Sequence, residues 1–188
     1  MKKHIITISG FPGSGKSSTA KGIALELGYE HFSSGDLFRE MAAERNLSVE
    51  GINFAAEKSK DIDYKVDKLL ESMGKEKDNL VIDSRTAFHW IPNSFKVFLD
   101  LDSRTSAERT FAQIQREGRT GQVGTSVKEV LGNTLKRVES ERKRYSDLYQ
   151  IDYMDKTQFN LIVDTKINNL EQAISIITSE YKNWLSTP

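Results

Sequence analysis

The chain of 188 residues is long enough for one domain and would hold two only if both were small. Lysine plus arginine and aspartate plus glutamate number 27 each, so the chain has no excess charge with which to bind nucleic acid or a membrane surface in bulk. The absence of cysteine excludes disulfides, zinc–thiolate sites and a thiol nucleophile, and the three histidines are too few and scattered for a metal cluster.

The first apolar run, at 4–9, follows two lysines but is far too short to be the core of a signal peptide. No window approaches the ~20 apolar residues that a membrane span requires. We therefore expect a soluble, cytoplasmic protein with no membrane or nucleic-acid partner. Because no long exposed apolar stripe demands a second chain, we also expect a monomer.

Short apolar, β-branched runs alternate with longer amphipathic segments along the chain. The first helix follows the strand at 4–9 and is expected to end at Gly28, and the last helix is expected to begin with a capping box formed by Asn168 and Glu171. This alternation predicts an α/β fold with a five-stranded parallel sheet and helices on both faces. The predicted strands are 4–9, 29–34, 79–84, 94–102 and 159–165.

We interpret the chain as a single domain with two excursions above the carboxyl edge of the sheet, where an α/β protein builds its ligand site. The core would comprise 1–35, 75–115 and 126–188, with a helical excursion at 36–74 and a lid at about 116–126. Within the helical excursion, which would bind the acceptor, the alternating charges of 58–68 are most simply a solvated helix face, although the position of this segment suggests a part of the acceptor-binding subdomain.

The residues from Gly10 to Ser17 fit G-x-x-x-x-G-K-[ST] without a mismatch and lie between a strand and a helix. Glycines allow backbone N–H groups to surround phosphates, and the N-terminus of the helix adds positive potential. Lys16 would reach the β- and γ-phosphates of ATP, while Ser17 would ligate Mg²⁺ and Asp83 would hold it through water. The motif predicts the P-loop NTPase fold. The predicted ATP-binding residues are Gly10, Phe11, Pro12, Gly13, Ser14, Gly15, Lys16, Ser17 and Ser18.

The phosphate loop alone does not distinguish a kinase from a switch or a motor. A guanine-nucleotide switch would usually carry Asp-x-x-Gly after the third strand, but this strand ends in Asp83-Ser84-Arg85-Thr86, and no Asn-Lys-x-Asp occurs. A motor ATPase would usually be longer. The small size and the excursions over the site favour a phosphotransferase that closes over a small acceptor.

Four segments in order resemble the nucleoside monophosphate kinase family, and most closely its short cytidylate kinases. They are the phosphate loop with "TAKGIALELG", then "FSSGDLFREMA", "VIDSRTAFHW" and "RVESERKRYSDLYQIDYMDKTQFNLIVDT". The resemblance implies ATP-dependent phosphorylation of CMP or dCMP to CDP or dCDP. Ser84 replaces the family's usual glycine, and this difference favours the alternative of another small acceptor. A non-enzymatic regulatory protein on the same scaffold is the remaining alternative.

The same resemblance implies roles for individual side chains. Arg39, Arg85, Arg137 and Arg144 would bind the acceptor phosphate, Glu141 would lie near the cytosine edge, and Arg116, with Arg119, would close from the lid onto ATP. The residues expected to bind the acceptor are Gly35, Asp36, Arg39, Arg85, Arg137, Glu141 and Arg144. Those expected to act in catalysis are Lys16, Arg85, Arg116, Arg137 and Arg144.

Two of these roles have a structural alternative. Arg137, Glu141 and Arg144 are spaced i, i+4 and i+7, which suits one binding face of a helix but equally suits an intrahelical salt bridge. Asp36 could hydrogen-bond the acceptor's sugar, although we favour the interpretation that it caps the following helix.

Overall fold

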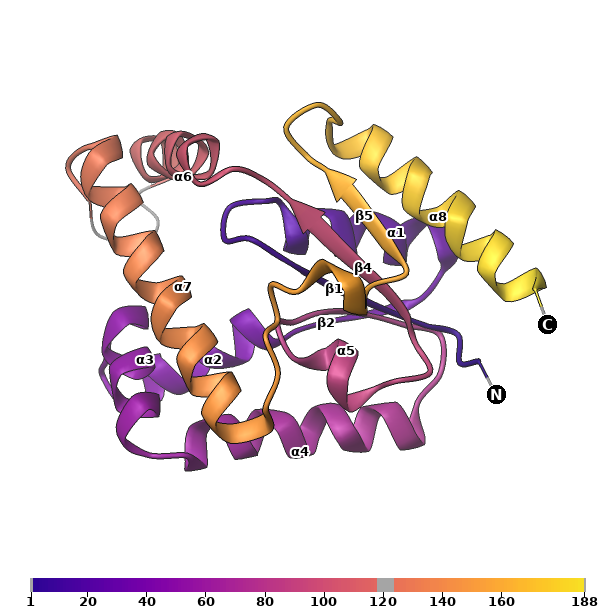
Figure 1. Cartoon of the computed structure of the whole chain (residues 1–188), viewed down its shortest axis with the longest axis horizontal. Helices are drawn as coiled ribbons and strands as arrows, with labels where there is room; N and C mark the ends of the chain where they lie inside the picture. Colours follow the sequence, from indigo (N-terminus) through magenta and orange to yellow (C-terminus); the bar gives the residue numbers. More distant parts are fainter. Residues whose placement is uncertain (1, 118–123, 188) are drawn as a thin grey trace.

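The computed structural model describes residues 2–117 and 124–187, in which a parallel sheet lies between two layers of helices (Figure 1). The five strands run in the spatial order β2-β3-β1-β4-β5, and every neighbouring pair is parallel. This confirms the predicted fold class. The strands are β1 (Ile5–Gly10), β2 (Glu30–Ser33), β3 (Leu80–Asp83), β4 (Phe95–Asp100) and β5 (Leu161–Asp164).

Helices account for most of the rest of the described chain, and the predicted helical regions are confirmed. Two short elements were not predicted: the single-turn helix α5 and a 3₁₀ turn at Lys156–Gln158. The helices are α1 (Lys16–Leu27), α2 (Ser34–Glu44), α3 (Val49–Lys58), α4 (Asp61–Glu76), α5 (Ala87–Trp90), α6 (Ser103–Glu117), α7 (Val127–Tyr149) and α8 (Leu170–Ser186).

The central strands β1 and β3 are buried on both faces and β4 nearly so, as their apolar runs predict, whereas the edge strands β2 and β5 are partly exposed. Side chains of β1 alternate: Ile6 and Ile8 join a core with α1 and α8, while Ile5 joins a second core with α2, α3, α4 and α5. A third cluster beneath the C-terminal half of α7 includes Phe88 and Tyr153. Helices α2, α3 and α7 lie beside the carboxyl ends of the strands, while α4 runs along one face of the sheet (Figure 1).

The structure confirms one predicted helix end and corrects two others. Gly28 ends α1 in the left-handed conformation, with φ 67°. The capping box of α8 is formed by Asn169 and Gln172, one residue later than predicted, because Asn168 instead donates its side-chain amide to the carbonyl of Asp164. Ser33, not Asp36, caps α2: its hydroxyl accepts the Asp36 N–H, so Asp36 lies inside the first turn.

Among the described residues, no helix has both the length and the apolar character needed to cross a bilayer.

Candidate active site

The phosphate loop joins the end of β1 to the start of α1 and is shaped by glycines in the left-handed region. Gly13 and Gly15 have φ of 75° and 87°. Helix α6 braces the loop from the side, because Ser106 Oγ donates to the Pro12 carbonyl over 2.6 Å. The loop is therefore held from two directions, by the strand it leaves and by a helix almost a hundred residues further along the chain.

Lys16 folds back over the loop in this structure. Its Nζ donates to the carbonyls of Gly10 and Phe11 over 3.0 and 2.8 Å. Burial, and then the positive charge of Arg85, lower the pKa of Lys16 to about 7. A negative phosphate would stabilise the charged ammonium, so the lysine is suited to bind an anion.

Gly10 is the loop position with the least room for a side chain. Its φ is 142°, and a Cβ there would lie 2.3 Å from the Leu99 carbonyl oxygen in the next strand. We predict that Gly10→Ala lowers the free energy of unfolding by about 1–3 kcal/mol and weakens ATP binding, because the strained backbone must move.

Denaturant unfolding and calorimetric ATP titration measure both effects of Gly10→Ala. Gly132 supplies the matched control, because it lies inside α7 and nothing comes within 4 Å of an added Cβ. Gly132→Ala should gain up to about 1 kcal/mol from helix propensity. Equal behaviour of the two variants would contradict the close packing of the loop on β4.

Asp83 and Ser17 meet at the carboxyl ends of β1 and β3, with Ser17 Oγ donating to Asp83 Oδ1 over 3.0 Å. Ser33 Oγ donates to the same oxygen over 3.0 Å, and His31 Nε2 lies 2.7 Å from Oδ2. Burial opposes ionisation of Asp83, but the bonds from His31 and Ser17 outweigh it and lower its pKa. A hydroxyl and an ionised carboxylate are hard oxygen donors of the kind that Mg²⁺ prefers, so the pair fits this ion.

A cavity of about 220 Å³ extends from the phosphate loop to the α2–α4 excursion. Most of the predicted ligand-binding residues line it, and they come from β3, α1, α2, α7 and the loop. The predicted residues among its lining are Pro12, Gly13, Gly15, Lys16, Ser17, Ser18, Gly35, Arg39, Asp83, Arg85, Arg137 and Glu141. Residues that lie far apart in the sequence therefore share one hollow at the carboxyl edge of the sheet.

Glu141 is 2% exposed and lies between Arg85 and Arg137, the two arginines that form a cationic wall of the cavity. Its Oε2 is 2.6 Å from Arg85 Nε and accepts from Tyr153, and its Oε1 accepts from Arg137 Nε over 2.9 Å. Burial opposes ionisation, but Arg85 and then Arg137 lower the pKa of Glu141 to about 2. The intrahelical salt bridge with Arg137 is thus present, and it faces the cavity. The predicted contact of Glu141 with cytosine stays a prediction.

Arg144 does not line the cavity. It is 7% exposed, and its Nε lies 2.8 Å from Oδ2 of Asp63 on α4. Of the residue set predicted to bind the acceptor phosphate, the structure brings Arg39, Arg85 and Arg137 to the hollow and leaves Arg144 behind its wall.

The remaining predicted residues lie at the rim. Arg39 pairs with Asp36 one turn earlier on α2 and is 43% exposed. Arg116 is exposed in the last turn of α6, one turn beyond Gln113, which lines the cavity. Most of the predicted lid, with Arg119, lies outside the described residues.

Two acidic residues on α4, Asp63 and Asp67, also line the cavity and were not predicted. The segment 58–68 was expected to be a solvated face, but Asp63 and Asp67 are 2% and 5% exposed. The sequence did carry a signal, because each follows a buried apolar residue, Ile62 or Val66, and so falls on the apolar side of the helix.

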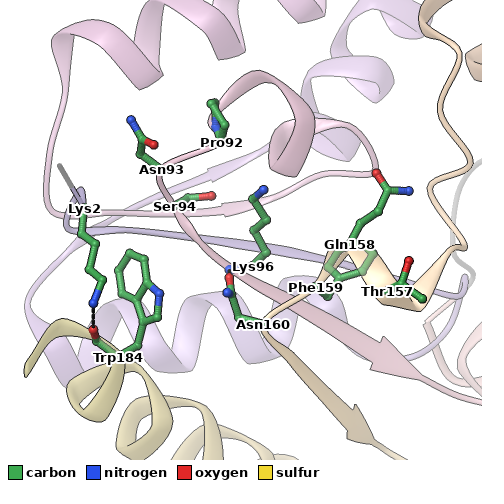
Figure 2. A pocket seen from close by; sticks show the side chains of 10 residues that line it. All are labelled: Lys2, Pro92, Asn93, Ser94, Lys96, Thr157, Gln158, Phe159, Asn160 and Trp184. Carbon is green, nitrogen blue, oxygen red and sulfur yellow. Dashed lines mark hydrogen bonds between the residues drawn. The ribbon is translucent and has the colours of Figure 1, made fainter. Parts of the chain in front are cut away.

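A second hollow, of about 350 Å³, lies at the opposite edge of the sheet (Figure 2). Its polar groups are largely occupied in holding the chain together. Lys2 Nζ donates to the Trp184 carbonyl, Ser94 Oγ donates to Ile91, and the Lys96 N–H donates to the Asn160 side chain. Although this hollow is larger, it is remote from the phosphate loop and from the arginines, so the chemistry is placed in the smaller one.

The fold and the site together define a P-loop phosphotransferase of the nucleoside monophosphate kinase class. The sequence matches the family described as an AAA domain over residues 9–147. The cytidylate kinase of Halorubrum lacusprofundi is 36% identical, over 93% of this chain and 88% of that protein. The cytidylate kinase of Desulfurococcus amylolyticus is 34% identical, over 93% and 90%. The chain belongs to the cytidylate kinase family.

Solved structures support the fold independently of these sequences. A shikimate kinase from Bacteroides thetaiotaomicron aligns with a TM-score of 0.65 at 16% identity, covering 95% of this chain and 98% of that one. A gluconokinase from Sinorhizobium meliloti aligns with a TM-score of 0.58 at 16% identity over all of both chains. At this identity the likeness concerns the fold alone.

Proposed function

We propose that the protein transfers the γ-phosphoryl group of ATP to CMP or dCMP, giving ADP and CDP or dCDP. The observation that carries this proposal is that one cavity joins the phosphate loop to Arg39, Arg85 and Arg137. A donor phosphate and an acceptor phosphate could therefore be held in the same hollow. The relatives named cytidylate kinase support the choice of acceptor.

In this proposal the protein's positively charged side chains position the two substrates and neutralise their phosphates. Phosphoryl transfer needs positioning and charge neutralisation, with no covalent intermediate on the protein. Lys16 and the loop N–H groups would hold the ATP phosphates, and Arg85 and Arg137 would orient the acceptor phosphate for in-line attack on the γ-phosphorus. Arg39 would hold the acceptor from the rim, and Arg144 would support the wall through Asp63.

Ser17 and Asp83 would hold Mg²⁺ against the ATP phosphates, where the ion would neutralise their charge. His31 would keep Asp83 oriented through its 2.7 Å contact. The excursion formed by α2, α3 and α4 would bind the acceptor nucleoside. Arg116 would reach the donor phosphates from the end of α6. We further propose that the protein acts as a monomer in the cytoplasm.

The test is an acceptor panel. Purified protein with ATP and Mg²⁺ is offered CMP, dCMP, UMP, AMP and simple metabolites such as shikimate and gluconate, and ADP formation is measured. The proposal predicts the highest kcat/KM with CMP or dCMP. Turnover of another acceptor, with none of CMP or dCMP, would retain the kinase assignment and reject the proposed acceptor. The panel includes these other acceptors because Ser84 replaces the glycine that is usual in the family. No turnover with any acceptor would favour a regulatory nucleotide-binding protein.

A further inference from the structure

The acidic side of the cavity consists of two carboxylates one turn apart on α4. Asp63 and Asp67 are 2% and 5% exposed, and both line the hollow that also contains Lys16 and Arg137. Buried carboxylates are rarely kept unless they are paired or used. Their surroundings therefore indicate whether each is only structural.

Asp67 is fixed in place by three donors. Trp90 Nε1 and Thr86 Oγ1 donate to its Oδ1 over 2.8 and 3.4 Å, and the Tyr149 hydroxyl donates to its Oδ2. A carboxylate has about four acceptor positions, so one on Oδ2 is left. The side chain is rigidly oriented and still able to accept one more hydrogen bond.

Asp63 has more unused capacity. Arg144 Nε lies 2.8 Å from its Oδ2, yet among the described residues this buried oxygen accepts no hydrogen bond of good geometry. Burial raises the pKa of Asp63 to about 6; Arg144 opposes the rise and Asp67 adds to it. Burial likewise raises the pKa of Asp67. Two mutually repelling carboxylates in a cleft are typical of a functional site.

A ligand group that satisfies both carboxylates must be a hydrogen-bond donor. The exocyclic amino group of cytosine is such a donor, whereas uracil presents a carbonyl oxygen at the same position. Glu141 is less suited to this task, because two guanidinium groups, those of Arg85 and Arg137, already compensate its charge. We propose that Asp63 and Asp67 recognise the amino group of the acceptor's cytosine and exclude uracil.

This inference rests on the proposed function, since it concerns the base of the same acceptor. The phosphate of the acceptor would face Arg85 and Arg137, and its base would face α4. Arg144 is then a positioning residue: its charge keeps Asp63 ionised and directed toward the base. The arrangement separates the two tasks, with a cationic wall for the phosphate and an acidic wall for the amino group.

The main test is Asp67→Asn, with CMP and UMP as acceptors. Asparagine can still accept from Trp90, but its amide N–H can face uracil O4 without repulsion. We expect the ratio of kcat/KM for CMP to that for UMP to fall about ten- to a hundredfold, the usual effect of losing a hydrogen bond to a charged group. Glu71→Gln is the matched control, because Glu71 lies on the same helix and pairs with Lys75 outside the cavity. It should leave the ratio unchanged.

Asp63→Asn is the second variant, and because it leaves Arg144 buried without a charge partner, its folding is checked by thermal unfolding. Calorimetric binding of CMP and UMP without ATP extends the test to a protein that shows no turnover. An inactive wild type that binds CMP more tightly than UMP, with the preference lost in Asp67→Asn, would reject the proposed function and retain the inference. An unchanged CMP preference in folded variants would overturn the inference, as would a preference lost in Glu141→Gln but kept in both aspartate variants.

Discussion

Arg85→Ala is expected to lower kcat/KM for the acceptor about 10²- to 10³-fold while leaving the affinity for ATP nearly unchanged. Arg85 lines the cavity at the end of β3 and pairs with Glu141, so its guanidinium is fixed before any ligand arrives. Removing a preorganised charge from a phosphoryl-transfer site typically costs this much. Burial lowers the pKa of Arg85, but the negative charge of Glu141 outweighs this effect and raises the pKa. Arg85 is therefore charged at any working pH.

The measurement is steady-state kinetics with CMP as the varied substrate, together with calorimetric titration of ATP. Arg142→Ala is the matched control, because Arg142 lies on α7 near the same site but pairs with Asp152 on the surface. This control should keep its activity. Full activity of Arg85→Ala would remove Arg85 from the site, and an equal loss of ATP binding would place it on the donor side.

The ATP-binding part of the site could be predicted from the sequence, because the residues that form it are neighbours in the chain. The loop from Gly10 to Ser17 carries its own turn residues, its lysine and the start of its helix within eight positions. The first strand was predictable for the same reason, since Ile5–Ile8 is a short run in which every residue is β-branched. The strand order was not predictable, because it depends on which crossover packs beside which strand.

The acceptor half could be predicted only in part, because its contacts are long-range. Arg85 and Arg137 were identified, yet nothing local shows that Arg85 would meet Glu141 across 56 positions or that Asp63 would meet Arg144. The charged run at 58–68 was read by composition as a solvated face. Its periodicity, with Ile62, Val66 and Leu70 on one side, indicates the buried face that the structure contains.

Glu141→Gln is expected to lower the free energy of unfolding at pH 7 by about 3–5 kcal/mol, the usual effect of removing one partner from a buried ion cluster. Glu141 is 2% exposed and compensates two guanidinium groups, of which Arg85 is 16% exposed. Because the folded-state pKa of Glu141 is lowered to about 2, its stabilisation is complete above the ordinary value of 4.5. The stabilisation is lost as pH falls from there toward 2.

Urea unfolding of both proteins between pH 3 and pH 7 measures this difference, which should stay constant down to about pH 4.5 and shrink below it. Glu139→Gln, an exposed neighbour on α7, should change stability by less than about 0.5 kcal/mol at any of these pH values. If the Glu141→Gln protein were as stable as the wild type at pH 7, solvent rather than Glu141 would compensate the positive charges of Arg85 and Arg137. Arg85 and Arg137 would then not be fixed before the acceptor arrives, and the expected loss of activity in Arg85→Ala would have to arise from the bound state alone.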